Sequence, residues 1–149
     1  MKKHGFSMIE LLFAMIIMAA LAAIAIPSLK SGTDSASYTA LRSDTANFLS
    51  IAQADYANEL TFVASDGGSD GFTDTDDDGI ADTGGLDGDG KINGKNVTVS
   101  KGTVIYSTPT DCNGDGDING ITLSVANANL PRYVYYSSCT SGKFTMVDK

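Results

Sequence analysis

The sequence predicts an α+β fold in which one long N-terminal α-helix packs, through its second half, on a C-terminal antiparallel β-sheet. Three features of the chain predict this fold. Residues 11–26 carry no polar side chain. Apolar residues then recur every three or four positions as far as Leu60, which is the period of a helix. Beyond position 95, short segments alternate apolar and polar residues, which is the period of a strand.

The apolar stretch 6–26 is the first element, and its length predicts a membrane-spanning helix. With a rise of about 1.5 Å per residue it can cross a hydrocarbon core of about 30 Å. Lys2 and Lys3 precede it, so the positive-inside rule keeps them inside and places the rest of the chain outside. The stretch holds a single carboxylate, Glu10. Because a charge in hydrocarbon costs about 2.5–3.5 kcal/mol, Glu10 needs a cationic partner.

The string GFSMIELLFAMIIMAALAAIAIP, residues 5–27, closely resembles the N-terminus of type IV prepilins and of the pseudopilins of type II secretion. The resemblance implies that a prepilin peptidase cleaves after Gly5 and methylates the new N-terminal residue, Phe6. It also implies that Glu10 neutralises the terminal amine of a neighbouring subunit during filament assembly. The domains that follow are a prepilin leader at 1–5, a hydrophobic transmembrane and assembly helix at 6–27, and a globular pilin domain at 28–149.

Within the globular domain we expect a helix at 28–62, an Asp/Gly-rich loop at 64–94 and an antiparallel sheet at 95–149. Pro27 removes one backbone donor and should kink the long helix rather than end it. Residues at helical spacing form one apolar helix face: Leu41, Thr45, Phe48, Ala52, Tyr56 and Leu60. Polar residues are expected on the other faces: Arg42, Asp44, Asn47, Gln53 and Asp55.

The segment 64–94 consists largely of Asp, Gly, Ser and Thr, with almost no large apolar residue, and this composition predicts a loop without a core of its own. Strand-like runs follow it at 96–100, 103–107, 121–126, 132–137 and 143–147. Short turns between these runs favour antiparallel pairing. The apolar face of the resulting sheet needs a partner, and the helix face before position 60 supplies it.

Charge and residue content exclude several functions. The formal net charge is −8, and loss of Lys2 and Lys3 with the leader makes it −10. Basic residues are few and scattered, so nucleic acid is disfavoured as a main partner. The only histidine, His4, lies in the leader, and the mature chain would therefore lack the commonest general base. The sequence presents no enzyme active site.

Cys112 and Cys139 are the only cysteines. An exported domain meets an oxidising compartment, so we predict that they form a disulfide. A redox or metal-binding pair is disfavoured because the spacing is not CxxC and no histidine accompanies it. A bond between them resembles the C-terminal disulfide loop of many pilins.

Aspartates gather in two clusters that have the spacing of calcium loops. Such loops place oxygen ligands at positions 1, 3, 5 and 9 and a glycine at position 6. The matching residues are Asp74, Asp76, Asp78, Gly79 and Asp82 in the first loop and Asp111, Asn113, Asp115, Gly116 and Asn119 in the second. A third, truncated copy contains Asp87 and Asp89, but Gly85 occupies its first ligand position.

None of these loops has the glutamate that normally ends a calcium loop at position 12, where Gly85, Thr122 and Asn96 stand instead. Each loop would need a ligand from elsewhere, or the loops would pair and share ligands. We therefore expect weak Ca²⁺ sites. Hard oxygen ligands without histidine or thiolate exclude zinc and copper as intended metals. The other interpretation of the clusters is a solvated acidic surface.

The combined features favour a structural subunit of a type IV pilus, polymerised through its N-terminal helix. Its expected partners are copies of itself, the prepilin peptidase and the inner-membrane assembly machinery. Before assembly it would be a single-pass inner-membrane protein with its C-terminus outside, and afterwards part of an extracellular pilus. One alternative is a major pseudopilin of a type II secretion system, in a periplasmic pseudopilus. A second is a secreted calcium-binding module whose ordinary signal peptide is cleaved near residues 23–25.

Overall fold

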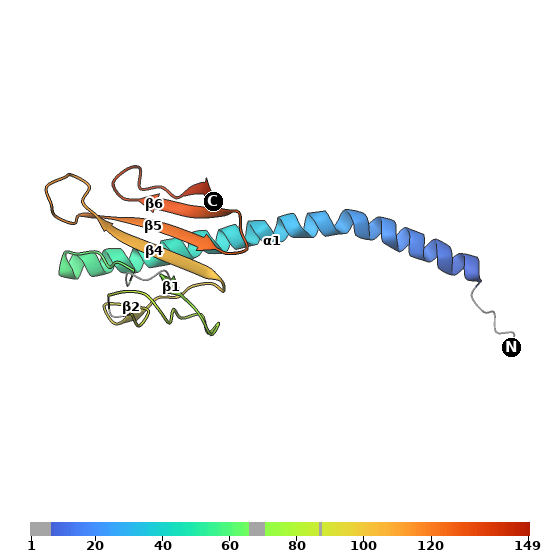
Figure 1. Ribbon diagram of the computed structural model, residues 1–149, viewed down its shortest axis with the longest axis horizontal. Helices are drawn as coiled ribbons and strands as arrows, with labels where there is room; N and C mark the ends of the chain where they lie inside the picture. Colours follow the sequence, from blue (N-terminus) through green and yellow to red (C-terminus); the bar gives the residue numbers. More distant parts are fainter. Residues whose placement is uncertain (1–6, 66–70, 87) are drawn as a thin grey trace. The chain divides into compact units, whose positions relative to one another are not determined.

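The computed structural model describes residues 7–65, 71–86 and 88–149, with side chains for all of these except 26–31. The chain divides into two compact units, Met1–Ala36 and Ser37–Lys149. The elements are α1 (Met8–Glu59), β1 (Phe72–Thr73), β2 (Lys91–Ile92), β3 (Lys95–Asn96), β4 (Thr103–Thr110), β5 (Gly120–Asn127), β6 (Arg132–Ser137) and β7 (Thr145–Asp148). Helix followed by antiparallel sheet confirms the predicted α+β, pilin-like fold (Figure 1).

Helix α1 continues through Pro27 and through the weakly helical residues 31–33, as far as Glu59. It therefore ends earlier than the predicted boundary at residue 62. The backbone N–H of Leu60 makes the last helical bond, 2.8 Å to the carbonyl oxygen of Tyr56. Leu60 itself has φ of 57°, which is the left-handed conformation that stops a helix and turns the chain away. Its side chain is exposed, so placing it on the buried face was wrong.

The five-stranded sheet has the order β1-β4-β5-β6-β7, and every neighbouring pair is antiparallel. The register places Ile105 opposite Val125, and Val125 opposite Val134. All three side chains are fully buried, while Tyr106 and Ser124, one position along, lie opposite each other on the outer face. This period of two is what the sequence predicted for a sheet with one covered face.

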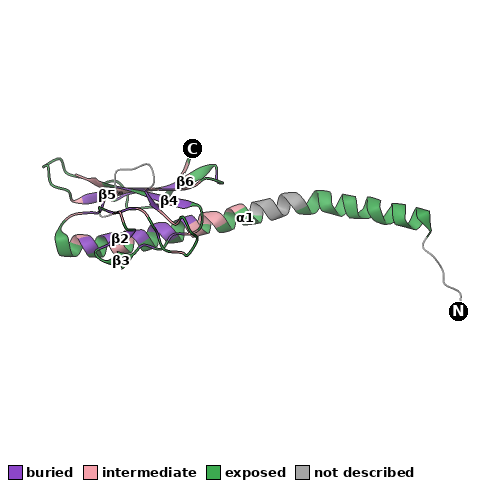
Figure 2. Ribbon diagram, turned by 60° about the horizontal axis from the view of Figure 1, so that its bottom comes forward, coloured by how far each residue is buried: buried purple, intermediate pink, exposed green. Residues whose placement is uncertain are grey.

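In the second unit, α1 covers that buried face. Leu41, Thr45, Phe48 and Ala52 are all buried, which confirms most of the predicted apolar face (Figure 2). The ring of Phe48 meets the ring of Phe72 edge-on, with centroids 4.8 Å apart. Edge-to-face pairs of this kind add about 0.5–1.5 kcal/mol to the burial of the rings themselves.

Two polar residues assigned to the outer faces of α1 were placed wrongly. Asp44 is 6% exposed and Asp55 is 3% exposed. Each lies three or four positions from Leu41, Phe48 or Ala52, so helical spacing brings both carboxylates to the covered side. Arg42, Asn47 and Gln53 are exposed as expected.

The Asp/Gly-rich segment was predicted to be a loop without a core of its own, but its described part contains buried apolar residues. Phe72, Ala81 and Ile92 are buried, and the two-residue strand β1 extends the sheet beside β4. Gly84 has φ of 119° and lies against the ring of Phe72, where a Cβ would collide with that ring. A few buried apolar residues therefore anchor the segment. The missing side chain of Gly84 lets the backbone pack closely against one of them, Phe72.

The predicted strand 96–100 is wrong. Only Lys95–Asn96 forms a strand, β3, which pairs with β2 in a separate hairpin. Val97 and Val99 are buried, but their backbone groups bond to the Asp/Gly-rich segment: Ala81 N–H to Val97 O at 2.7 Å, and Val99 N–H to Gly79 O at 3.4 Å. The last strand also lies slightly later than the predicted 143–147, beginning at Thr145.

Candidate functional site

The first candidate site is the N-terminal part of α1. Met8–Ala25 has a mean hydropathy of 2.5, and by length and composition this segment could cross a membrane. Its large apolar side chains are all more than half exposed. Figure 2 colours this part of the helix as exposed. A helix that is apolar on every side is stable only inside a bilayer or among other helices. This segment therefore needs a non-aqueous environment or copies of itself.

Glu10 lies in the first turn of this helix and caps it. Its Oε2 atom accepts a hydrogen bond of 2.9 Å from the backbone N–H of Ser7, the residue that precedes the helix. This is one half of a capping box, and it places the negative charge at the positive end of the helix dipole. Gly5 and Phe6, the predicted processing residues, lie outside the described residues.

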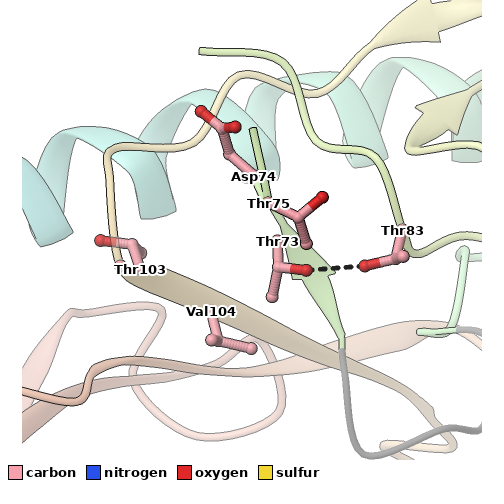
Figure 3. Close-up of a pocket in the computed structure, with 7 residues that line it drawn as sticks. Thr73, Asp74, Thr75, Thr83, Thr103 and Val104 are labelled. Atoms are coloured by element: carbon pink, nitrogen blue, oxygen red, sulfur yellow. Dashed lines mark hydrogen bonds between the residues drawn. The ribbon is translucent and has the colours of Figure 1, made fainter. Parts of the chain in front are cut away.

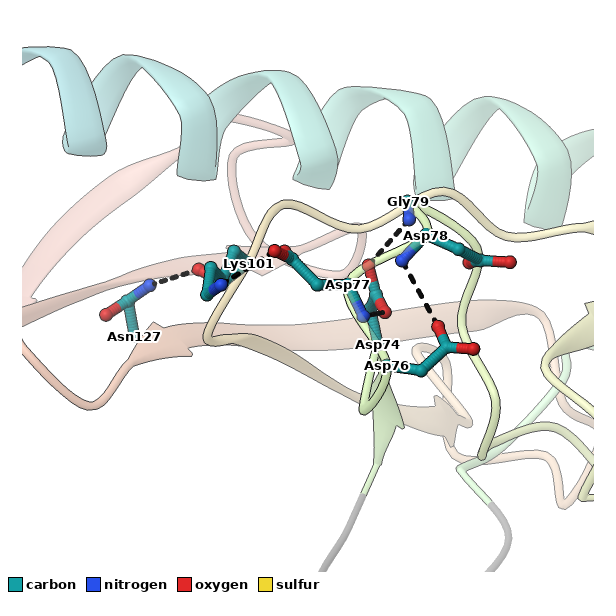
Figure 4. A network of polar contacts seen from close by, with 7 residues as sticks. All are labelled: Asp74, Asp76, Asp77, Asp78, Gly79, Lys101 and Asn127. Carbon is teal, nitrogen blue, oxygen red and sulfur yellow. Dashed lines mark hydrogen bonds and ion pairs between the residues drawn. The ribbon is translucent and has the colours of Figure 1, made fainter.

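The second candidate site is the first Asp loop, drawn in Figure 4. Carboxylate oxygens of Asp74, Asp76 and Asp78 lie within 4.8 Å of one another, and such a group could hold a metal ion. Asp74 accepts hydrogen bonds from the N–H groups of Asp77, at 2.6 Å, and Gly79, at 2.7 Å. These bonds fold the loop around its first ligand position.

The fourth predicted ligand of this loop points back to its beginning. The Asp82 carboxylate accepts hydrogen bonds from the N–H and from the hydroxyl of Thr75. These bonds lower the pKa of the Asp82 carboxyl, which therefore stays ionised. Lys101 holds the outside of the loop through an ion pair of 2.6 Å with Asp77.

The second Asp loop repeats the first almost bond for bond. Asp111 accepts from Gly114 at 2.7 Å and from Gly116 at 2.8 Å, as Asp74 accepts from the residues at the same loop positions. Asn119 accepts from the N–H of Cys112 at 2.8 Å, which is the bond that Asp82 makes with Thr75. The N–H groups of Gly116 and Gly114 lower the pKa of the Asp111 carboxyl. Two segments far apart in the sequence have therefore folded into one loop type.

The ligands of the second loop also converge. The amide of Asn113 donates to Asp115 at 2.7 Å and accepts from the amide of Asn119 at 2.7 Å. In the third, truncated copy, Asp89 forms an ion pair of 3.2 Å with Lys91, and Asp87 lies outside the described residues.

The first and second Asp loops lie at opposite ends of strand β4. Thr73, just before the first loop, pairs with Val104, whereas the second loop begins directly after Thr110. Six residues of extended strand separate them, or roughly 20 Å at about 3.4 Å per residue. Sharing of one ion between these loops is therefore excluded by the fold, and each loop must complete its own coordination.

A cavity of about 380 Å³ adjoins the first loop. It is lined by Asp74, Gly102, Val104 and four threonines, Thr73, Thr75, Thr83 and Thr103, and all of these except Gly102 are labelled in Figure 3. The hydroxyls of Thr73 and Thr83 are hydrogen-bonded at 2.6 Å. This bond joins the residue before the loop to the residue after it, and so holds the two ends of the loop together.

The N-terminus matches a known protein-family model. Residues 1–26 match the prokaryotic N-terminal methylation motif, the leader signature of type IV pilins and pseudopilins. The match covers the leader and the first part of α1, and it supports a type IV pilin-like or pseudopilin protein. Neither the curated proteins nor the solved structures include a match to this chain. The motif indicates a structural subunit that is processed by prepilin peptidase and assembles with copies of itself, and it favours these classes over a module with an ordinary signal peptide.

Cys112 and Cys139 are joined as a disulfide, with Cα atoms 5.0 Å apart. Cys112 occupies the second position of the second Asp loop, and Cys139 follows β6. Gly120 lies against the disulfide, where a Cβ would collide with the Cys112 sulfur and with the Ser138 hydroxyl. The bond therefore fastens the second loop to the turn after β6.

The buried carboxylate of Asp44 is a feature that the sequence did not predict. It accepts hydrogen bonds from the backbone N–H of Ser100, at 3.0 Å, and from the Ser100 hydroxyl, at 3.1 Å. Burial raises the pKa of the Asp44 carboxyl, and the two bonds from Ser100 only partly offset this. Asp44 thus ties α1 to the chain entering β4, in a partly desolvated setting.

We expect Asp44→Asn to raise the free energy of unfolding near pH 7, by about 1 kcal/mol. Because the folded state binds the Asp44 proton more tightly than the unfolded state, the ionised carboxylate is a cost above its folded pKa. The cost disappears as the pH falls toward the ordinary value of 3.8, and the advantage of the variant should shrink with it. Denaturant unfolding at several pH values measures this. Equal gains at every pH would contradict the prediction.

Proposed function

We propose that this protein is a structural subunit of a type IV pilus filament, polymerised through its N-terminal helix. The observation that carries the proposal is the helix Met8–Ala25, which is exposed and apolar on all sides and has one carboxylate, Glu10, at its start. A bilayer satisfies such a helix before assembly, and identical helices satisfy it afterwards.

The role of Glu10 follows from its position. It lies four residues after Phe6, which would carry the terminal amine after cleavage. Within an apolar bundle an unpaired carboxylate and an unpaired amine would both be destabilising, and pairing between neighbouring subunits removes both penalties. Such a pair also fixes the axial register between subunits, which apolar contacts alone specify poorly.

A major pseudopilin of type II secretion is the alternative. The disulfide near the C-terminus supports the pilin, because many pilins have a similar C-terminal disulfide loop. The calcium-type loops support the pseudopilin, because major pseudopilins commonly carry a calcium site. Immunogold electron microscopy of intact cells, with fractionation of sheared filaments, distinguishes the two. Labelled filaments outside the cell support the pilus, and protein retained in the periplasm supports the pseudopilus.

Processing provides a direct test. We expect Gly5→Leu to block cleavage, because a bulky side chain then replaces the glycine of the motif directly before the cut, and the uncut precursor should accumulate in the inner membrane. Mass spectrometry of the membrane fraction measures this. The wild-type chain should begin at a methylated Phe6, and His4→Ala is the matched leader control. A mature chain beginning at Phe6 in the Gly5→Leu variant would contradict the assigned cut.

We further propose that both Asp loops bind calcium. Two loops with the same backbone hydrogen bonds, and with oxygen ligands at the same positions, support it. The described loops lack the carboxylate at position 12, so we expect dissociation constants on the order of 10⁻⁴–10⁻³ M. Bound calcium would neutralise carboxylates that repel one another and would stabilise a segment with few apolar anchors.

Thermal melts of the full chain in nonionic detergent test calcium binding. At a hundredfold excess over Kd, calcium should stabilise the folded state by about 2.7 kcal/mol for each site that binds it only when folded. Asp78→Ala and Asp115→Ala should each remove one contribution. Magnesium, which demands a tighter octahedral shell, is the ionic control. If calcium leaves the melting temperature unchanged, the proposal is contradicted and both loops are solvated acidic surface.

A further inference from the structure

A cavity of about 290 Å³ lies between the end of α1 and the β2–β3 hairpin. Asp55 and Glu59 line it from the helix, and Lys91, Asn93 and Gly94 line it from the hairpin. The cavity is separate from both Asp loops, none of whose ligands line it. It therefore forms a third place where oxygen ligands from distant parts of the chain meet.

Asp55 sets this cavity apart. The residue is 3% exposed, and among the described residues its Oδ1 atom has no hydrogen-bond partner. Asp44, the other buried carboxylate of α1, has partners for both oxygens. Taking an ionised carboxylate out of water without a partner is strongly unfavourable, so Asp55 requires a proton or a cation.

The surrounding atoms favour a cation. Glu59 follows Asp55 by one helical turn, so both carboxylates lie on the same side of α1. Asn93 has φ of 50° and Gly94 has φ of 73°, the pair of values of a tight hairpin turn, and this turn places both residues in the lining of the cavity. Lys91 also lines the cavity, but its ammonium is engaged by Asp89 at 3.2 Å.

We propose that this cavity is a binding site for a hard divalent cation, held by the carboxylates of Asp55 and Glu59 and by the amide oxygen of Asn93. Oxygen ligands of this kind select calcium or magnesium over transition metals. The ion would join the end of α1 to the hairpin, two parts of the unit that lie more than thirty positions apart in the sequence. The site shares no ligand with the two calcium loops. Its hairpin ligand, Asn93, belongs to the truncated third copy of the loop pattern.

Calcium titration of the full chain in nonionic detergent, followed by calorimetry, tests the proposal. The starting protein is the double variant Asp78→Ala/Asp115→Ala, in which both loops are disabled. It should still bind one calcium ion per chain. Adding Asp55→Asn should abolish that binding, and adding Glu59→Gln should weaken it at least tenfold. Asp44→Asn, which changes the other buried helix carboxylate, is the matched control and should leave binding unchanged.

Melting temperatures separate ligation from a structural effect. In chelator, Asp55→Asn should melt higher than the starting protein, because it removes an unpartnered buried charge. In saturating calcium the starting protein should rise and the Asp55→Asn variant should not. A double variant that binds no calcium, or binds it regardless of Asp55, would overturn the proposal. If the wild type binds two more calcium ions per chain than the double variant, this supports binding by the two Asp loops. The loop proposal and the cavity proposal can therefore fail independently.

Discussion

Glu10→Ala should abolish or sharply reduce incorporation of this protein into filaments, while leaving it synthesised, cleaved and inserted in the membrane. The carboxylate is not needed for insertion, since removing a charge from an apolar helix makes insertion easier. In the proposed filament, the carboxylate neutralises an amine among packed helices, and the alanine variant cannot do so. Quantifying sheared filaments against total membrane protein by immunoblot measures the effect, with cleavage checked by mass spectrometry.

Glu10→Gln separates the two roles that the structure gives this side chain. A glutamine can still accept the hydrogen bond from the backbone N–H of Ser7, which the glutamate accepts at 2.9 Å. It cannot neutralise an amine. If charge pairing drives assembly, the glutamine variant should fail as the alanine variant does; if capping of α1 suffices, it should assemble. Asp34→Ala, elsewhere on the same helix, is the control and should assemble normally. Normal filament yield from Glu10→Ala would contradict the proposed role.

The sequence predicts well those parts of the fold that repeat. The long helix and the central strands carry apolar residues at a period of three to four or of two over many positions, so a few unfavourable residues do not hide the signal. Strands β4, β5 and β6 lie where the alternation placed them, and Phe48 and Ala52 are buried as their spacing predicted.

Prediction was poorer where single residues decide the structure. Val97 and Val99 alternate as a strand would, but their backbone groups bond to Ala81 and Gly79 in a segment that composition alone assigned to an uncovered loop. Nothing local in the sequence reveals that pairing, because it depends on contacts between distant segments. The buried carboxylates of Asp44 and Asp55 were missed for a different reason. Their polarity favours an outer face, whereas helical spacing places both of them on the covered side of α1.

For the Asp loops, the sequence predicts the local loop geometry but not the position of one loop relative to the other. Spacing identified the two loops, and the matching hydrogen bonds of Asp74 and Asp111 follow from that spacing. The sequence could not exclude that the loops share an ion. That exclusion comes from strand β4, whose pairing with β1 fixes one loop at each of its ends.

Replacing both cysteines, as Cys112→Ser/Cys139→Ser, should lower the free energy of unfolding of the globular unit by about 3–4 kcal/mol, which is the chain-entropy estimate for a loop of this size. The two residues are 27 positions apart, and no other cysteine in the chain can replace either of them. Denaturant unfolding of the exported protein measures the difference. Non-reducing mass spectrometry should first show the intramolecular bond; two free thiols, or pairing between subunits, would contradict it.

The disulfide should also act selectively on the two Asp loops. Cys112 belongs to the second loop, where its N–H donates 2.8 Å to Asn119, and the neighbouring N–H of Ile121 donates 2.9 Å to Ser138 beside Cys139. Breaking the bond frees the second loop from the turn after β6, whereas the first loop is held by Lys101 and by β1. Calcium binding by the second loop should therefore weaken in the double serine variant while that of the first stays unchanged, which titration in the Asp78→Ala and Asp115→Ala backgrounds resolves. Equal weakening of both loops would mean that the bond stabilises the unit as a whole and does not hold the second loop in particular.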